Sequence, residues 1–338
     1  MKVEEAIGKR AAHDLSVVTA EVKGTLVKRG DVIKDADVNA LKEAGHDFIA
    51  VLDPQGRELD VIWEDEAVVE LANAVAGDGC EVTYAGEGKA FVFAERCGVL
   101  GIDDERVRRV NLSTDFRLIT RRGGSWVNRG DLVYVVDLIP LHITRQDMEK
   151  AMKAAGLERA VKVVESLGLS AGLVVTGTEV YEGRIKDLAE DKVRAKLEMY
   201  GCKLTDKVIA PDDEAVISRA VSDMASSHDL VVVTGGMSVD PTDVTSRAVL
   251  ATGAKLVIYG FPIKPTTMSL LAYLNGKPVI GLSSGIIRFA DENVLDVLLP
   301  RICSGGSWSK EELAALGNGG IMKSFLDDVA KRGTSHHG

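Results

Sequence analysis

Three segments in the second half of the sequence place glycines, hydroxyls and charged residues directly after apolar runs. The first reads Thr176-Gly-Thr-Glu179 and continues to Gly183-Arg-Ile-Lys-Asp187. Gly177 lets the chain turn sharply after the apolar run, because glycine tolerates backbone angles that other residues avoid. Glu179 and Asp187 could then form a carboxylate pair that holds a cation or accepts protons. A simpler alternative is that Asp187 only caps the helix that follows.

The second segment reads Thr234-Gly-Gly-Met-Ser-Val-Asp-Pro-Thr-Asp243. Its glycines, Gly235 and Gly236, expose backbone N–H groups and admit close approach by an anionic ligand. Ser238 adds a hydroxyl, and Asp243 could bind a metal ion or cap the next helix. Phosphate oxygens and carboxylates in one loop usually need a bridging cation, so this segment predicts Mg²⁺.

The third segment is Phe261-Pro-Ile-Lys-Pro-Thr-Thr267, which follows another apolar run. Pro265 restricts the backbone of Lys264 to an extended conformation, which would hold its ammonium group in a fixed place. An isolated lysine is ordinarily a solvated surface residue. Its position after a predicted strand, with two hydroxyl residues following, makes Lys264 a candidate cation at the ends of the strands, where the first two segments also lie.

Strands that alternate with amphipathic helices must position these segments. Continuous apolar runs, typical of strands buried on both faces of a parallel sheet, predict strands at 173–176, 230–234 and 255–259. Apolar residues spaced by three and four predict helices at 186–200, after Asp212 and Asp213, at 243–253 and at 286–299. Asn275-Gly276 predicts a hairpin. The fold class is therefore α/β, with a Rossmann-like, mostly parallel sheet whose ligands bind at the carboxyl ends of the strands.

The first half of the chain shows shorter elements and few long helices. Asp35 or Asp37 can cap a helix that Gly45 ends in the left-handed conformation, and a strand is expected at 48–52. A helical pattern begins at Arg145 and continues to Ser166. We therefore expect a β-rich or mixed N-terminal region at 1–168, which could hold two small domains. The α/β domain follows at 169–304, and Gly-rich punctuation predicts a loosely attached tail at 305–338.

Composition excludes several classes of protein. The 338 residues are 46% hydrophobic and 27% charged, as in globular proteins of two or three domains. The formal net charge of −10 disfavours nucleic acid and anionic membranes as partners, because their binding requires basic patches. No apolar run is long enough to cross a bilayer, and the acidic N-terminus does not resemble a signal peptide. These features predict a cytoplasmic protein.

The four cysteines are scattered through the chain and form no C-x-x-C pair. They are Cys80, Cys97, Cys202 and Cys303. Without such a pair or an adjacent histidine, we expect neither a disulfide framework nor a zinc site. The interpretation is that all four are reduced thiols in a reducing compartment.

Together, the three segments resemble a known family. The order T-G-T-E, G-R-I-x-D, T-G-G-M-S-V-x-x-x-D and I-K-P is similar to the molybdenum-cofactor biosynthesis domain shared by molybdopterin molybdotransferases and gephyrin. The resemblance covers about residues 172–301. Pro241-Thr-Asp-Val-Thr245 is also similar to the molybdopterin adenylyltransferase branch and to competence-damage-type nucleotide hydrolases. The N-terminal half is weakly similar to the domains that precede this one in molybdotransferases.

The resemblance implies a pocket for the pterin dithiolene of molybdopterin and for its phosphate. Carried over residue by residue, it implies Asp187 and Asp243 as the functional acids, which are also the candidate Mg²⁺ ligands. It implies Lys264 as the cation of the family's K-P-G element. The other candidate ligand-binding residues are Thr176, Gly177, Glu179, Thr234, Gly235, Gly236, Ser238, Ser283 and Ser284.

Three departures from the family pattern concern the ligand side. The family's K-P-G-K-P reads Lys264-Pro-Thr-Thr-Met268, and its G-L-P-G-N-P reads Gly281-Leu-Ser-Ser-Gly-Ile286. Asp240 stands where a glycine is expected. These changes remove one cation and alter two turns, so we expect binding with little or no metal insertion. The alternative is that Arg288 or Lys277 replaces the lost cation.

The predicted function is binding of molybdopterin or adenylylated molybdopterin in molybdenum cofactor biosynthesis, with molybdate insertion as the activity if the protein is an enzyme. One alternative is Mg²⁺-dependent hydrolysis of a nucleotide pyrophosphate through Asp243. Another is a non-catalytic carrier that hands the cofactor to a molybdoenzyme. The expected partners are the pterin, a molybdoenzyme or another cofactor-biosynthesis protein, and a second copy in a homodimer, the commonest soluble assembly.

Overall fold

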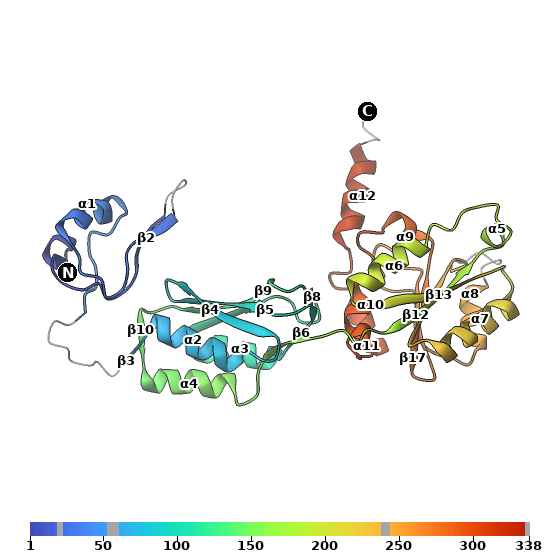
Figure 1. The fold of residues 1–338 in the computed structure, drawn as a ribbon, viewed down its shortest axis with the longest axis horizontal. Helices are drawn as coiled ribbons and strands as arrows, with labels where there is room; N and C mark the ends of the chain where they lie inside the picture. Colours follow the sequence, from blue (N-terminus) through green and yellow to red (C-terminus); the bar gives the residue numbers. More distant parts are fainter. Residues whose placement is uncertain (19–22, 53–60, 238–243, 335–338) are drawn as a thin grey trace. The chain divides into compact units, whose positions relative to one another are not determined.

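The computed structural model describes residues 1–18, 23–52, 61–237 and 244–334, which divide into two units (Figure 1). The first unit comprises Met1–Arg96, Leu100–Gly123 and Val127–Val163. The second comprises Cys97–Val99, Gly124–Trp126 and Val164–Gly338. No helix in the described ranges is long and apolar enough to span a membrane.

The first 52 residues build a small core of their own. Their elements are η1 (Val3–Ala6), β1 (Leu15–Val18), β2 (Lys23–Val27) and α1 (Asp35–Glu43). Asp37 caps α1 by accepting a hydrogen bond from the Lys34 N–H at 2.8 Å, and Gly45 follows the helix at φ +88°. Both features were predicted. The strand expected at 48–52 was wrong, because only isolated bridges from Phe48 and Val51 occur there.

Residues 61–164 carry a second core, in which helices pack on a four-stranded antiparallel sheet of order β4-β5-β9-β7. The elements are β3 (Val61–Trp63), α2 (Glu64–Val75), β4 (Cys80–Gly86), β5 (Lys89–Ala94), β6 (Gly98–Ile102), α3 (Asp104–Ser113), β7 (Phe116–Thr120), β8 (Trp126–Val127), β9 (Leu132–Leu138), β10 (His142–Thr144), α4 (Arg145–Ala155) and β11 (Val161–Val164). The region is therefore mixed. The helical pattern expected up to Ser166 ends at Ala155, where Gly156 adopts φ +82°.

A six-stranded sheet of order β13-β12-β14-β17-β16-β15 forms the centre of the second unit. Its strands are β12 (Ser170–Thr176), β13 (Lys203–Ala210), β14 (Leu230–Thr234), β15 (Lys255–Tyr259), β16 (Leu270–Leu274) and β17 (Lys277–Leu282). The first four strands in the spatial order pair in parallel, and only β16 runs against the others. The predicted Rossmann-like, mostly parallel α/β fold is confirmed.

Helices cover both faces of this sheet (Figure 1). They are α5 (Thr178–Tyr181), α6 (Glu190–Met199), α7 (Glu214–Ser227), α8 (Thr245–Ala251), α9 (Gly285–Arg288) and α10 (Val294–Cys303). Leu197 of α6 and Leu298 of α10 belong to the core on one face. Val221 of α7 and Val249 of α8 belong to the core on the other. β14 is buried along its whole length, as its continuous apolar run requires.

Local signals explain several boundaries in this unit. Asp213 caps α7 by accepting from the Val216 N–H at 2.9 Å, and Asn275 and Gly276 form the predicted hairpin turn with positive φ. The single helix expected at 286–299 is wrong. It divides into α9 and α10, because the Asn293 side chain accepts from the Leu295 N–H at 3.0 Å and starts a new helix.

The C-terminal residues form two further helices, α11 (Lys310–Ala315) and α12 (Lys323–Thr334). Leu313 of α11 is fully buried in the core shared with α6 and α10. Before α12, Ile321 pairs in a parallel bridge with Lys264. The segment that we expected to be a loosely attached tail thus makes specific contacts in the second unit.

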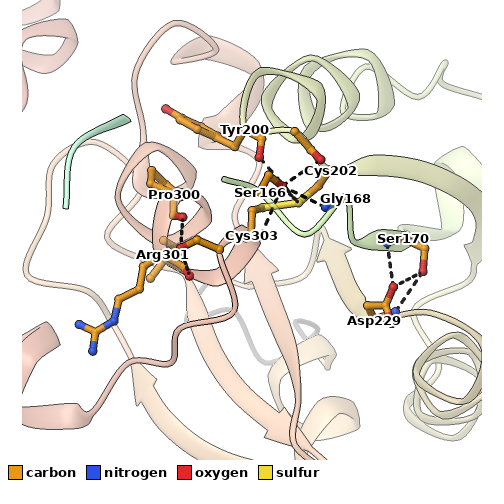
Figure 2. Close-up of a disulfide and its surroundings, with 12 residues drawn as sticks. Ser166, Gly168, Ser170, Tyr200, Cys202, Asp229, Pro300, Arg301 and Cys303 are labelled. Atoms are coloured by element: carbon orange, nitrogen blue, oxygen red, sulfur yellow. Dashed lines mark hydrogen bonds between the residues drawn. A yellow bond between two sulfur atoms is a disulfide. The ribbon is translucent and has the colours of Figure 1, made fainter. Parts of the chain in front are cut away.

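A disulfide joins Cys202, which follows α6, to Cys303 at the end of α10 (Figure 2). The Ser166 hydroxyl lies beside it and donates to the carbonyl oxygens of Gly201 and Cys303, at 3.0 and 3.3 Å. The expectation that all four cysteines are reduced is therefore wrong, although Cys80 and Cys97 are free. No local motif marks this pair, because only the packing of α6 against α10 brings the two cysteines together.

Candidate functional site

The chain order places a crevice between β12 and β14. From β12 the chain goes to β13 on one side, and it then returns to β14 on the other side. In open parallel sheets such a switch point opens a crevice at the carboxyl ends of the strands, where ligands bind. A cavity of about 180 Å³ lies there, lined by Val175, Thr176, Val180, Ile185, Lys186, Asp187, Leu188, Ala189, Thr234, Gly235, Ser284, Ile286 and Ile287.

Two threonines, Thr176 and Thr234, line this cavity, and both are buried. Thr176 Oγ1 donates to the Thr234 carbonyl oxygen at 3.0 Å and lies 3.0 Å from Thr245 Oγ1. The Thr234 hydroxyl is buried, and it has no hydrogen-bond partner among the described residues. A buried hydroxyl without a partner costs free energy, so a polar atom of a ligand in the cavity would be favoured beside Thr234.

The two glycines after β14 are required by close approach of the backbone. A Cβ atom on Gly235 would lie 2.4 Å from the Thr176 carbonyl oxygen, and one on Gly236 would lie 2.6 Å from Thr245 Oγ1. Their φ angles are +94° and +54°, which also favour glycine. The Gly235 N–H donates to the Leu282 carbonyl oxygen at 3.2 Å, so it is not the free donor that we expected for a phosphate.

Asp187 lines the cavity, but other groups engage its carboxylate. Oδ1 accepts from the N–H groups of Ala189 and Glu190 at 2.8 and 3.4 Å, and Oδ2 lies 3.4 Å from Lys207 Nζ. The simpler alternative, in which Asp187 holds the start of α6, therefore describes its contacts. Lys207 also donates to Glu190 at 2.5 Å, and this hydrogen bond lowers the pKa of Glu190 and raises that of Lys207.

The described donors do not fit a magnesium site. Within the described ranges, no three His, Cys, Asp or Glu side chains gather to hold a metal ion. Glu179 is exposed on α5 and does not line the cavity. Asp243 and Ser238 lie outside the described residues. The one candidate acid in the cavity, Asp187, already faces a lysine, so we derive no chemical step from a metal.

The walls of the cavity are aliphatic, a feature that the sequence analysis missed. Val180, Ile185 and Leu188 approach from the segment after β12, and Ile286 and Ile287 approach from α9. A signal existed in the two apolar residues, Ile185 and Leu188, that flank Asp187. Apolar walls around a few hydroxyls suit a ring system with polar atoms at one edge.

Lys264 is not among the residues that line this cavity. Its N–H donates to the Gly320 carbonyl oxygen at 2.7 Å, and its own carbonyl oxygen accepts from the Met322 N–H at 2.8 Å. Its ammonium nitrogen lies 5.9 Å from the ring centre of Phe325 in α12. The C-terminal segment therefore fixes the backbone of Lys264.

Lys277 and Arg288, the two cations considered as replacements for the family's second lysine, differ from each other in their position relative to the cavity. Lys277 begins β17, at the opposite end from the cavity, and donates to the Ala225 carbonyl oxygen at 2.8 Å. Arg288 ends α9, whose Ile286 and Ile287 line the cavity, and forms an ion pair with Asp328 at 2.5 Å. Of these two, only Arg288 belongs to an element of the site.

The structure brings together five of the candidate residues: the cavity is lined by Thr176, Asp187, Thr234, Gly235 and Ser284. The other described candidates stand outside its lining: Gly177, Glu179, Gly236, Lys264 and Ser283. Thr245 was not a candidate. It is fully buried and contacts Thr176, so it supports the base of the cavity.

Comparison with known proteins identifies the domain that carries this cavity. Residues 172–302 match a family model described as "Probable molybdopterin binding domain". Residues 1–53 match a second model, described as a domain of unknown function. A solved structure of the molybdopterin biosynthesis Mog protein from Mycobacterium ulcerans has 20% sequence identity and a TM-score of 0.33, covering 39% of this chain and 93% of that one.

Relatives with similar sequences cover parts of the chain. A Methanocaldococcus jannaschii protein named for molybdopterin biosynthesis is 28% identical over 258 residues, which are 66% of this chain and 60% of the relative. The molybdopterin molybdenumtransferase of Haemophilus influenzae is 34% identical over 104 residues, 29% of this chain and 26% of the relative. A CinA-like protein of Geobacter metallireducens is 34% identical over 91 residues, 27% of this chain and 22% of the relative.

Each of these matches spans less than two thirds of the relative's length. The matches therefore cover only parts of these relatives, and the Methanocaldococcus match extends beyond residues 172–302. The matched residues include every described residue that lines the cavity. Residues 172–302, which carry the cavity, are thus similar to probable molybdopterin binding domains.

Proposed function

We propose that this protein binds molybdopterin, or its adenylylated form, in the cavity at the carboxyl ends of β12 and β14. The observation that carries the proposal is the buried Thr234 hydroxyl, which has no partner among the described residues at the base of an aliphatic cavity. A heteroaromatic ring would satisfy this hydroxyl at one edge and bury its faces against Val180, Leu188 and Ile287. The family of residues 172–302 makes a pterin the ring of choice.

We further propose that this protein inserts molybdate poorly or not at all. Insertion brings a second anion to an already anionic ligand, so it depends on cations that face the reacting groups. The family's second lysine is replaced here by Thr267, and two of the described cations are paired, Lys207 with Asp187 and Arg288 with Asp328. Lys186 lines the cavity. A role in holding or delivering the cofactor to a molybdoenzyme is consistent with that arrangement.

Calorimetric titration of the purified protein with molybdopterin tests the binding proposal. Thr234→Val removes the hydroxyl at nearly constant volume. It should weaken binding by about twofold to twelvefold, the effect of losing one ordinary hydrogen bond of 0.5 to 1.5 kcal/mol. The matched control is Thr205→Val in β13, whose hydroxyl donates to the Ala171 carbonyl oxygen at 3.4 Å, away from the cavity.

Three results are informative. Weaker binding by Thr234→Val with unchanged binding by Thr205→Val supports the site. Equal affinities for the protein and both variants would place the ligand elsewhere. Absence of binding by the wild-type protein would overturn the proposed function itself.

A further inference from the structure

The cation nearest in sequence to the cavity lining on α9 is Arg288. Ser284 lines the cavity at the start of this single helical turn, and Arg288 follows it by four residues. Residues four apart lie on the same face of a helix, so Arg288 shares a face of this turn with Ser284, although its own side chain is not part of the cavity lining. The two residues between them that line the cavity, Ile286 and Ile287, fix the turn against its wall.

A carboxylate of the C-terminal helix α12 forms an ion pair with this guanidinium. Arg288 Nη2 lies 2.5 Å from Asp328 Oδ1 of α12, and Asp328 Oδ2 lies 3.0 Å from Arg332 Nε. The Asp328 side chain is 17% exposed, whereas that of Arg288 is 56% exposed. The acid is therefore the more buried partner, and the guanidinium is the more accessible one.

Contacts made by residues before Asp328 hold the start of α12 in place. The Ser324 N–H and hydroxyl both bind Glu292, at 2.9 and 3.0 Å. The rings of Phe325 and Phe289 lie 6.3 Å apart between centres. Together with the backbone bridge from Lys264 to Ile321, these contacts hold α12 against two segments, one around Lys264 and one at residues 289–292, directly after α9.

We infer that Arg288 is an anion-binding residue of this cavity and that Asp328 competes with the ligand for it. Water and salt screen an ion pair whose arginine is 56% exposed, so its net contribution to stability is small. A phosphate offers a guanidinium two parallel hydrogen bonds and more charge than one carboxylate. A ligand phosphate can therefore replace Asp328 as the partner of Arg288. Because Asp328 belongs to α12, this helix sets the affinity for anionic ligands.

The inference rests on the proposed function only for the identity of the ligand. The test uses the full chain and two probes, molybdopterin and inorganic pyrophosphate. Asp328→Asn should bind both probes about threefold to tenfold more tightly than the wild type, because the competitor for Arg288 loses its charge. Asp327→Asn is the matched control, since Asp327 pairs with Lys323 at 2.8 Å within α12 and should leave both affinities unchanged.

Arg288→Gln completes the cycle. It should weaken binding of both probes, and the double variant Arg288→Gln/Asp328→Asn should bind no more tightly than Arg288→Gln alone. Unfolding midpoints of all variants within a few degrees of the wild type confirm that the fold is intact.

The two proposals fail in different ways. Pyrophosphate binding that follows this pattern without any molybdopterin binding would overturn the proposed function and leave the inference standing. Unchanged or weaker pyrophosphate binding by folded Asp328→Asn, or no binding by it at all, would overturn the inference.

Discussion

Reduction of the Cys202–Cys303 disulfide should destabilise the second unit strongly. The two cysteines are separated by 101 residues, which include β13, β14, β17 and α9. The bond therefore encloses most of the sheet and the elements around the cavity. In the unfolded chain it removes the conformations in which the ends of this long loop are apart.

The loop length sets the expected magnitude. In the chain-entropy description, closing a loop of about 100 residues stabilises the folded state by about 4.7 kcal/mol at 25 °C, and measured losses on removal are about 2 to 5 kcal/mol. For a unit of this size each kcal/mol shifts the unfolding midpoint by about 2 to 4 °C. We expect the midpoint of the second unit to fall by about 4 to 20 °C on reduction.

Reductant is a cleaner perturbation than substitution, because the two cysteines are 1% and 0% exposed and a replaced side chain would also disturb packing. Thermal unfolding is followed with and without dithiothreitol, and thiols are counted after denaturation. Two thiols, Cys80 and Cys97, should titrate without reductant, and four should titrate with it. The control is Cys80→Ser/Cys97→Ser, in which the full effect of reductant should persist.

Two outcomes would refute separate parts of this reasoning. Four thiols in unreduced, denatured protein would show that the disulfide does not form. Two thiols with an unfolding midpoint that reductant does not change would show that the bond forms but that loop closure is not what stabilises this unit.

Three further predictions concern single residues. Gly235→Ala should lower the free energy of unfolding by about 3 kcal/mol or more, because its Cβ would lie 2.4 Å from a carbonyl oxygen. The control is Gly253→Ala, at φ +86° in open space, which should lower it by only about 1 to 2 kcal/mol. Equal losses of the two variants in chemical denaturation would contradict the close-approach argument. Burial raises the pKa of Cys80 to about 11, so only about 0.3% of this thiol is thiolate at pH 8.5. Iodoacetamide should therefore modify exposed Cys97 first, and the rate of Cys80 modification should rise about tenfold per pH unit. Similar modification rates for the two thiols at pH 8.5 would refute this. Thr267→Lys should raise molybdate insertion into adenylylated molybdopterin by at least about tenfold by adding a cation, whereas a wild-type rate equal to that of a full molybdotransferase would remove the reason for the effect.

Three of the strands, β12, β14 and β15, could be predicted from the sequence because each contains a continuous apolar run. Strands β14 and β15 have the predicted bounds, and the Asn275-Gly276 turn predicts the β16–β17 hairpin. Strand β13 gave no such signal. It lies at the edge of the sheet, and four of its eight residues are exposed and polar. Its sequence therefore shows neither a continuous apolar run nor the alternation of apolar and polar residues that is typical of a half-buried strand.

The base of the cavity could also be predicted, because threonines and glycines directly after buried strands stand at the carboxyl edge of a parallel sheet. Its walls could not, since Val180 and Leu188 are ordinary aliphatic residues whose role depends on the path of the chain. Lys264 was assigned to the ligand site from its position after a predicted strand and from the family's K-P-G element, whereas the contacts of its backbone come from Gly320 and Met322, more than fifty residues later. No local pattern reports such a long-range pairing.

The charges around this cavity make binding an exchange rather than a simple addition. An acidic chain holds Lys207 with two carboxylates and Arg288 with one, so each of these cations already has a partner before a ligand arrives. A phosphate that takes Arg288 must release Asp328, and the net gain is the difference between two ion pairs. Burial of a ring against the aliphatic walls involves no such exchange. We therefore expect the ring to supply most of the affinity and α12 to decide how much the phosphate adds.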